Sequence, residues 1–232
     1  MDRPSGTGES PSRVVVAIDG PAGAGKTTVA KGVAAVLGIA HLDTGAMYRA
    51  ITAKALAAGV GASDEEGLVD IARRTELAFM PDGLMVDGRP AGLSIRTLEV
   101  NRAVSEVSAH PGVRAEMVRQ QREIMRHGGI VAEGRDIGTV VYPEASVKIF
   151  LIASIRERAR RRLADHADAG ETVSIWDLEA DIARRDHLDS TRVHSPLAPA
   201  DDAIVLDTTV KTPDEVIAEI VALARAVERA EA

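Results

Sequence analysis

The chain has 232 residues, of which 45% are hydrophobic and 27% charged, a composition ordinary for a soluble globular protein with one large domain or a domain carrying an insertion. Its formal net charge of −7 argues against a nucleic-acid-binding protein, and its lack of cysteine excludes disulfide bonds and thiolate metal sites. No apolar run reaches membrane-spanning length, and residues 1–12 are expected to form a disordered tail without a signal core, so we expect a cytoplasmic location.

Short apolar runs predict strands buried on both faces of a sheet, and segments with a helical period lie between them. Gly38 ends the first helical segment, whereas Ser174 and Thr212 are the expected N-cap residues of two later ones. This alternation predicts an α/β fold with a parallel sheet covered on both faces. In chain order, the expected strands are residues 14–18, 39–42, 130–132, 147–153 and 204–207, and the expected helices lie around residues 29–37, 47–55, 113–124, 175–182 and 212–227.

The first expected strand runs into the stretch GPAGAGKTT, residues 20–28, which fits the phosphate-binding pattern G-x-x-x-x-G-K-[ST] and is called the cradle below. Its glycines let successive amides point at one anion, Lys26 reaches the β- and γ-phosphates, and the Thr27 hydroxyl can bind Mg²⁺. A chance match by an ordinary glycine-rich turn is the alternative, which the strand before and the helix after disfavour. The expected ATP-binding residues here are Gly20, Pro21, Ala22, Gly23, Ala24, Gly25, Lys26, Thr27 and Thr28.

A nucleoside triphosphate site does not by itself name the reaction. The guanine-reading element [NT]-K-x-D is missing from the sequence, which argues against a GTPase, and the chain is short for a motor. A kinase for a small acceptor remains. The excess of 23 arginines over five lysines fits a need for planar phosphate-binding groups, although codon bias is an alternative explanation.

Residues 75–93 break the alternation of strands and helices. They hold the turn signals Pro81-Asp82-Gly83 and Asp87-Gly88 between short apolar pieces. This pattern predicts a small antiparallel unit inserted into the α/β domain.

Three further stretches stand out: HLDTGAMYR at 41–49, GRDIGTVVYPEA at 134–145 and RRDHLDSTRVHSPLAP at 184–199. The first two follow expected strands, and open parallel sheets bind ligands at the carboxyl ends of their strands. With the cradle, these stretches resemble the bacterial cytidylate kinase family, nucleoside monophosphate kinases among the P-loop kinases. The resemblance runs from about residue 14 to residue 209 and includes SIRT at 94–97.

The resemblance implies a P-loop nucleoside monophosphate kinase fold, with a five-stranded parallel sheet flanked by helices, a small inserted α+β domain and a short lid. The implied core is residues 13–61 and 111–232, the lid is about residues 156–172, and the inserted domain that binds the monophosphate is residues 62–110. The implied activity transfers the γ-phosphoryl group of ATP to CMP or dCMP, giving CDP or dCDP and ADP, with Mg²⁺. We expect a monomer whose partners are nucleotides, without nucleic acid or membrane.

The resemblance also assigns roles to residues of the acceptor site. Arg49 would touch the acceptor phosphate, Ser105 and Arg114 would contact cytosine, and Asp136 would act through Mg²⁺ or by orienting Arg135. The implied CMP-binding residues are Thr44, Tyr48, Arg49, Ser105, Arg114, Gly134, Arg135, Asp136, Arg185, Asp189 and Arg192, the catalytic ones are Lys26, Arg135, Asp136 and Arg192, and the lid residues on ATP are Arg158, Arg161 and Arg162.

Elementary chemistry fits this assignment. A phosphate monoester is mostly a dianion near neutral pH, so it needs arginines to cancel its repulsion from ATP, and it needs no general base. The spacing of Arg185, Asp189 and Arg192 puts the three on one helical face if the helix extends that far, and a surface ion-pair ladder is the alternative. Trp176 and Phe150 are expected in the core.

Two other functions stay open. One is a kinase for another monophosphate, UMP or AMP. The other is a P-loop module that binds ATP for regulation without phosphoryl transfer, which the many arginines after strands disfavour.

Overall fold

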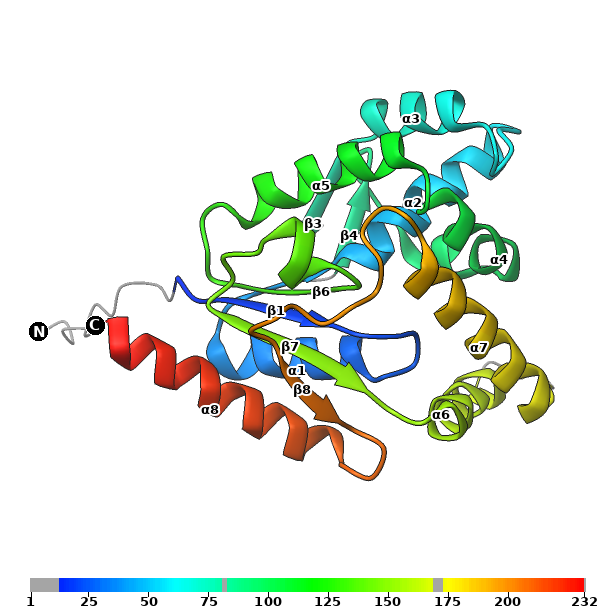
Figure 1. The fold of residues 1–232 in the computed structure, drawn as a ribbon. Coiled ribbons are helices and arrows are strands. Elements are labelled where there is room, and N and C mark those ends of the chain that lie inside the picture. The colour runs from blue at the N-terminus through cyan, green and yellow to red at the C-terminus, as the bar shows by residue number, and fades with distance from the viewer. Residues whose placement is uncertain (1–12, 81–82, 169–172, 232) are drawn as a thin grey trace, which may run out of the picture.

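The computed structural model describes residues 13–80, 83–168 and 173–231, so the expected tail lies outside the described residues. Its centre is a five-stranded sheet whose paired strands run parallel, as the sequence predicts. The order β2-β6-β1-β7-β8 places the strand before the cradle in the middle of the sheet (Figure 1). The strands are β1 (Val15–Asp19), β2 (Ala40–Asp43), β6 (Ile130–Gly134), β7 (Val147–Ile152) and β8 (Ile204–Asp207).

Helices cover both faces of this sheet (Figure 1). Val16 and Ile18 of β1 belong to the apolar layer beneath α1 and α8, whereas Ala17 of the same strand belongs to the layer beneath α2 and α5. All five residues of β1 are buried, which is why its first four residues, Val15–Ile18, are all apolar rather than alternating with polar ones. The covering helices are α1 (Lys26–Leu37), α2 (Thr44–Ala57), α5 (Pro111–Met125) and α8 (Pro213–Glu231).

The expected helix boundaries are confirmed where capping chemistry marks them. Gly38 follows α1 with a left-handed φ of 67°, which glycine adopts without strain. The Ser174 hydroxyl accepts from the Trp176 amide at the start of α7 (Ile175–Thr191). Before α8, Thr212 and Glu215 form a reciprocal capping box, since the Thr212 amide donates to the Glu215 carboxylate at 2.8 Å and the Glu215 amide donates to the Thr212 hydroxyl at 3.3 Å.

The segment between α2 and α5 contains the expected antiparallel unit. Strand β4 pairs with both β3 and β5 in a separate three-stranded sheet, and Asp87 at the β4–β5 turn has a positive φ of 50°. Residues 81–82 of the other expected turn lie outside the described residues. The elements of this segment are α3 (Glu65–Arg74), β3 (Leu77–Met80), β4 (Gly83–Val86), β5 (Arg89–Pro90), the 3₁₀ helix η1 (Gly92–Arg96) and α4 (Leu98–Val107).

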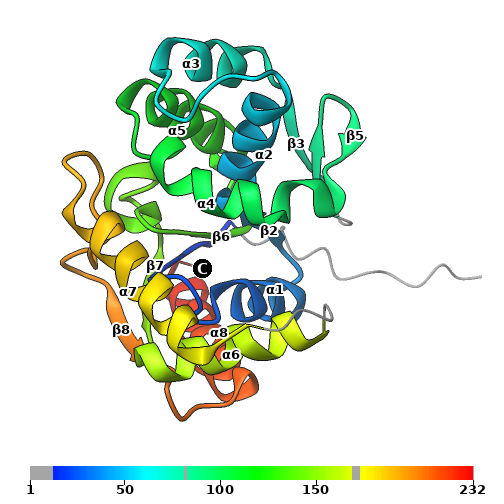
Figure 2. The same cartoon turned by 90° about the vertical axis from the view of Figure 1, so that its right-hand side faces the viewer.

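Two helices, α6 (Ile155–Asp168) and α7, pack together beyond the carboxyl ends of the strands (Figure 2). Ala159, Leu178 and Ile182 form the apolar contact between them. Phe150 is buried as expected, but the prediction for Trp176 is wrong, because this side chain lies at the solvent-facing start of α7 with 68% of its surface exposed. No helix among the described residues is long and apolar enough to cross a membrane.

Candidate active site

The cradle connects β1 to α1, and its first glycine is required by a close backbone contact. Gly20 has a φ of 144°, and a Cβ there would lie 2.2 Å from the carbonyl oxygen of Leu151 in β7, so no other residue fits. Gly25 begins α1 with a left-handed φ of 90°. The loop therefore curls tightly against the sheet, with the positive end of the α1 dipole at its end.

Lys26 lies buried beneath the loop, with only 6% of its surface exposed. Its ammonium group donates a 2.7 Å hydrogen bond to the carbonyl oxygen of Pro21. Burial and the nearby charge of Arg135 lower the pKa of Lys26 well below its ordinary value. Arg185 lowers this pKa further, whereas the carboxylates of Glu133 and Asp19 act in the opposite direction, so Lys26 is a buried cation among charges of both signs.

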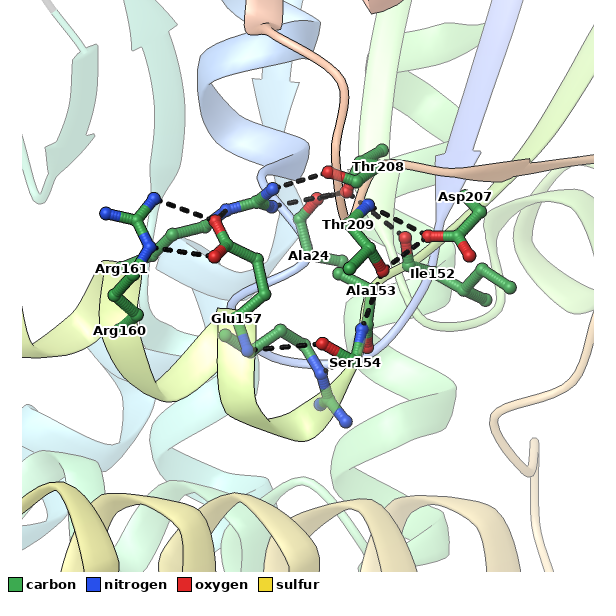
Figure 3. Close-up of polar contacts among 11 residues, drawn as sticks. Ala24, Ile152, Ala153, Ser154, Glu157, Arg160, Arg161, Asp207, Thr208 and Thr209 are labelled. Carbon is green, nitrogen blue, oxygen red and sulfur yellow. Dashed lines mark hydrogen bonds and ion pairs between the residues drawn. The ribbon is translucent and has the colours of Figure 1, made fainter.

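A cavity of about 660 Å³ opens over the cradle. Among its lining residues are Arg161 and Arg162 of α6, together with most of the expected ATP-binding residues. Arg161 donates to the carbonyl oxygen of Thr208 at 2.6 Å, and the Thr208 hydroxyl in turn donates to the carbonyl oxygen of Ala24 at 3.2 Å (Figure 3). These bonds fix the position of α6 relative to the cradle.

Arg158 differs from its two neighbours because its guanidinium is used within the protein. It is 4% exposed, donates to the carbonyl oxygen of Ala22 at 3.1 Å and pairs with Asp186 of α7 at 2.6 Å. Arg158 is absent from the residues that line this cavity among those described. Arg158 on α6 therefore links the cradle to α7.

A second cavity, of about 300 Å³, adjoins the first between the sheet edge, α4, α5 and α7. All of the expected CMP-binding residues line it except Ser105, whose place on α4 and the loop after it is taken by Val104 and Ser108. The two cavities share Gly23, Lys26, Thr27, Arg162 and Asp165 in their linings, so they meet at the cradle lysine.

Arg49 and Tyr48 enter this second cavity from α2. Arg49 is hydrogen-bonded to the Asn101 side chain of α4, and burial together with the positive charge of Arg96 lowers its pKa to about 10. Burial raises the pKa of Tyr48 to about 12. The Arg114 guanidinium lies over the Tyr48 ring at 5.6 Å, close enough for a cation–π contact.

A triangle of charges forms where β6 meets α7. Arg135 donates to the Asp189 carboxylate at 2.9 Å, and Arg185 lies 3.9 Å from the same oxygen. Burial would raise the pKa of Asp189, but Arg135 and Arg185 outweigh it and the pKa is lowered. Burial and repulsion from Arg135 lower the pKa of Arg185 to about 9. The excess positive charge faces the cavity.

Asp136 and Arg192 make a second ion pair beside the first. The Asp136 carboxylate is hydrogen-bonded to Arg114, and its other oxygen lies 3.9 Å from Arg192. The helix does not extend far enough to put Arg185, Asp189 and Arg192 on one helical face, because α7 ends at Thr191 and the backbone is extended at Arg192. The extended backbone nevertheless leaves Arg192 in the cavity lining.

Sequence reasoning missed several acids at this edge of the sheet. Glu133 near the end of β6 is buried, accepts from the Thr27 hydroxyl at 2.9 Å and lies 3.0 Å from the His41 ring. Asp43 at the end of β2 caps α2 and pairs with Arg96 of η1 at 3.3 Å. The available signal was positional, since polar residues at the carboxyl ends of parallel strands face the ligand edge.

Comparison with known proteins gives one consistent result. The family model described as cytidylate kinase matches residues 16–226. A cytidylate kinase of Anoxybacillus flavithermus is 47% identical, covering 91% of this chain and 96% of its own length. A bifunctional pantoate ligase/cytidylate kinase of Synechococcus sp. (strain JA-2-3B'a(2-13)) is 50% identical over 95% of this chain, but the chain spans only 42% of that longer relative. A solved structure, an uncharacterized protein from Eubacterium ventriosum, shares the fold with a TM-score of 0.52 at 11% identity over 93% of this chain and 99% of its own.

Proposed function

The chain belongs to the cytidylate kinase family, and from that premise we propose that it transfers the γ-phosphoryl group of ATP to CMP or dCMP, giving ADP and CDP or dCDP. The observation that carries the proposal is the junction of the two cavities at Lys26 and Thr27. A triphosphate on the cradle and a monophosphate among the arginines would meet end to end there.

The donor side suits a triphosphate. The cradle amides, the α1 dipole and Lys26 all favour negative charge, and bound phosphates would offset the burial that lowers the pKa of Lys26. Arg161 and Arg162 line the same cavity from α6 and would lie along the nucleotide. Helices α6 and α7 would act as a lid that excludes water from the transferring group.

The acceptor side suits a phosphate dianion. Arg49, Arg135, Arg185 and Arg192 line one cavity, and burial together with like charge lowers the pKa of Arg49 and of Arg185. An acceptor dianion would relieve this repulsion between the arginines. Because the dianion already carries a nucleophilic oxygen, the protein needs only to hold the two phosphates in line and to neutralise their charge. Asp189 would hold Arg135 in place and contact the sugar.

The pyrimidine would lie against α4 and α5. Arg114 and Ser108 line that end of the cavity, and the Ser108 carbonyl accepts from Arg114 at 3.3 Å. A guanidinium and a hydroxyl match the polar edge of cytosine. In this arrangement the Ser108 side chain, whose hydroxyl donates to the carbonyl oxygen of Ser105 at 3.1 Å, would supply the hydroxyl.

Mg²⁺ fits beside Thr27 and Glu133. The Thr27 hydroxyl proton points to the Glu133 carboxylate, which leaves the hydroxyl lone pairs for a cation. No group of three or more His, Cys, Asp or Glu side chains suited to a metal occurs among the described residues, which agrees with an ion held mainly by phosphate oxygens and water. When bound, Mg²⁺ would neutralise charge on the phosphates of ATP. We also propose a monomer that acts without nucleic acid.

An ADP-release assay with CMP, dCMP, UMP and AMP in turn, followed by identification of the diphosphate, tests the proposal. We expect CMP and dCMP to give the highest kcat/KM. A preference for UMP or AMP would reassign the acceptor, and ATP hydrolysis that no monophosphate stimulates would favour the regulatory module instead.

A further inference from the structure

Asp19 is a buried carboxylate that the proposed reaction does not use directly. It is the last residue of β1, stands immediately before the cradle and is 5% exposed. Its strand register places it beside Gly134 of β6, the residue before Arg135. Asp19 therefore lies where the donor loop and the acceptor loop leave the sheet together.

Both oxygens of Asp19 are used by one turn of the acceptor loop. Oδ1 accepts from the Ile137 amide and Oδ2 from the Gly138 amide, each at 2.8 Å. These amides begin the π-helical turn η2 (Ile137–Val141), and the first amides of such a turn have no partner within it. The carboxylate of Asp19 thus caps η2 from a strand far away in the sequence.

The residue that would ordinarily cap η2 is its N-cap residue, Asp136. Aspartate is among the preferred N-cap residues because its side chain accepts from the first free amides. Within the described residues, however, the Asp136 side chain makes no capping bond and turns instead to Arg114 and Arg192. Two carboxylates are thus available to cap η2. Because Asp19 accepts from its first amides, the Asp136 carboxylate stays with Arg114 and Arg192.

We propose that Asp19 is a positioning residue: by capping η2 in place of Asp136, it keeps the Asp136 carboxylate on Arg114 and Arg192 and so holds the acceptor half of the site. The proposal rests on the proposed function of that site. Burial raises the pKa of Asp19, and the charge of Asp136 adds to this, although the hydrogen bonds from the Gly138 and Ile137 amides act in the opposite direction.

The consequence is a separation of effects between the two substrates. Without Asp19, the amides of η2 lack an acceptor and Asp136 is the nearest replacement. If Asp136 turned to cap η2, Arg114 and Arg192 would lose their carboxylate partner, whereas Lys26 would keep its hydrogen bond to the carbonyl oxygen of Pro21. Loss of Asp19 should therefore lower kcat/KM for CMP but leave the affinity for ATP unchanged.

The test is a double-mutant cycle with Asp19→Asn and Asp136→Asn in the full chain. Asparagine can accept from only one of the two amides and presents its own donors to the other, so D19N removes half of the cap with almost no change of volume. We expect kcat/KM for CMP to fall by about tenfold to 100-fold in D19N, the range that a small misplacement of catalytic groups produces. ATP affinity, measured by calorimetry without acceptor, should stay within about twofold of wild type, because D19N leaves every donor of the cradle in place.

The cycle distinguishes positioning from general damage. If Asp19 acts through Asp136, adding D19N to D136N should cost little more, so the two effects are strongly non-additive. Additive losses, or an ATP affinity that falls as much as the CMP parameters, would overturn the proposal. Asp64→Asn is the matched control, because Asp64 caps the exposed start of α3 through the Gly67 amide at 3.0 Å and lies away from both cavities.

Failure of the inference and failure of the proposed function give different results. If wild type does not phosphorylate CMP, the proposed function fails first, and the D19N cycle is then run on whichever monophosphate is turned over. Should D19N unfold, circular dichroism will show it, and Asp19→Glu, whose longer side chain moves both acceptor oxygens away from the two amides, provides the second variant. A folded D19E or D19N with wild-type CMP kinetics would refute the positioning role.

Discussion

The Asp189 carboxylate on α7 accepts a 2.9 Å hydrogen bond from Nε of Arg135, which directly follows β6. This bond joins α7 to the sheet edge across 54 positions of sequence. It makes the position of Arg135 depend on α7, so a movement of α7 would shift Arg135 in the proposed acceptor site.

Asp189→Asn should lower kcat/KM for CMP by roughly tenfold to 100-fold, because losing a charge-assisted hydrogen bond costs about 1.5–3 kcal/mol. ATP affinity should be unchanged. Steady-state kinetics with each substrate varied in turn measures both effects. Asp181→Asn on the exposed face of the same helix, where Asp181 pairs with Arg184 at 2.9 Å, is the control. Wild-type CMP kinetics in D189N would show that Arg135 needs no support from α7.

Arg135→Ala should reduce kcat by about 100-fold or more while ATP affinity changes little, because the guanidinium serves the acceptor phosphate and the charge that develops on it. Turnover is measured at saturating CMP, and ATP binding by calorimetry. Arg74→Ala removes an exposed arginine of α3 that pairs with Asp70, and it should have no effect. Near-normal turnover of R135A at saturating CMP would contradict its role.

Lys26→Met should almost abolish transfer, by roughly 1000-fold, while leaving the fold intact. The nucleotide-free variant should melt no lower than wild type. Burial and Arg135 lower the pKa of Lys26, so its folded pKa lies below its unfolded pKa and the charged form opposes folding at neutral pH. Thermal unfolding without nucleotide checks this, and ATP should raise the melting temperature of wild type only. Normal activity in K26M would refute the role of the cradle.

Asp19 should make stability rise as the pH falls. Burial raises its pKa from 3.8 to about 6, so between these values the folded protein binds the proton more tightly than the unfolded chain. When the pH is lowered from 7 to 5, the free energy of unfolding of wild type relative to that of D19N should increase by about 1.4 kcal/mol. This is the energy of about one pKa unit, because pH 5 lies about one unit below the folded pKa of Asp19. Urea unfolding of both proteins at each pH gives the difference. A pH-independent difference would mean that Asp19 titrates normally.

Glu133→Gln should weaken the use of Mg²⁺ by roughly tenfold, as loss of a residue that orients a metal ligand commonly does. The Glu133 carboxylate can only accept, so it holds the Thr27 hydroxyl proton on its own side. The amide of glutamine can also donate, so the Thr27 hydroxyl proton would no longer be held in one direction. Calorimetry of Mg·ADP against ADP alone measures the effect apart from turnover. Glu144→Gln, at an exposed position, is the control. An unchanged Mg²⁺ dependence in E133Q would remove Glu133 from this role.

The fold was largely predictable because its central strands are buried on both faces. Such strands read as unbroken apolar runs, and glycine, proline and capping residues mark the helix ends between them. The cradle was also predictable, since its geometry depends on local glycines and on the strand and helix that flank them. These features are set by neighbours in sequence.

The contacts between distant segments were not predictable in the same way. Asp19 meets the amides of Ile137 and Gly138 across more than 100 positions, and no local pattern announces that a strand carboxylate will cap a distant turn. Ser108, directly after α4, lines the cavity and Ser105 does not, because the side of a short helix that faces a cavity is set by its packing against distant segments. The site residues carried by the resemblance stay predictions until the variants above are measured.

Trp176 gives the molecule a built-in optical signal. It is the single tryptophan of the chain, it is largely exposed at the start of α7, and the Arg156 guanidinium of α6 lies 5.4 Å from its ring. Fluorescence excited at the indole band therefore comes from the helix pair alone. Rapid mixing with ATP, CMP or both would time each movement of that pair against the appearance of product, without attaching a dye.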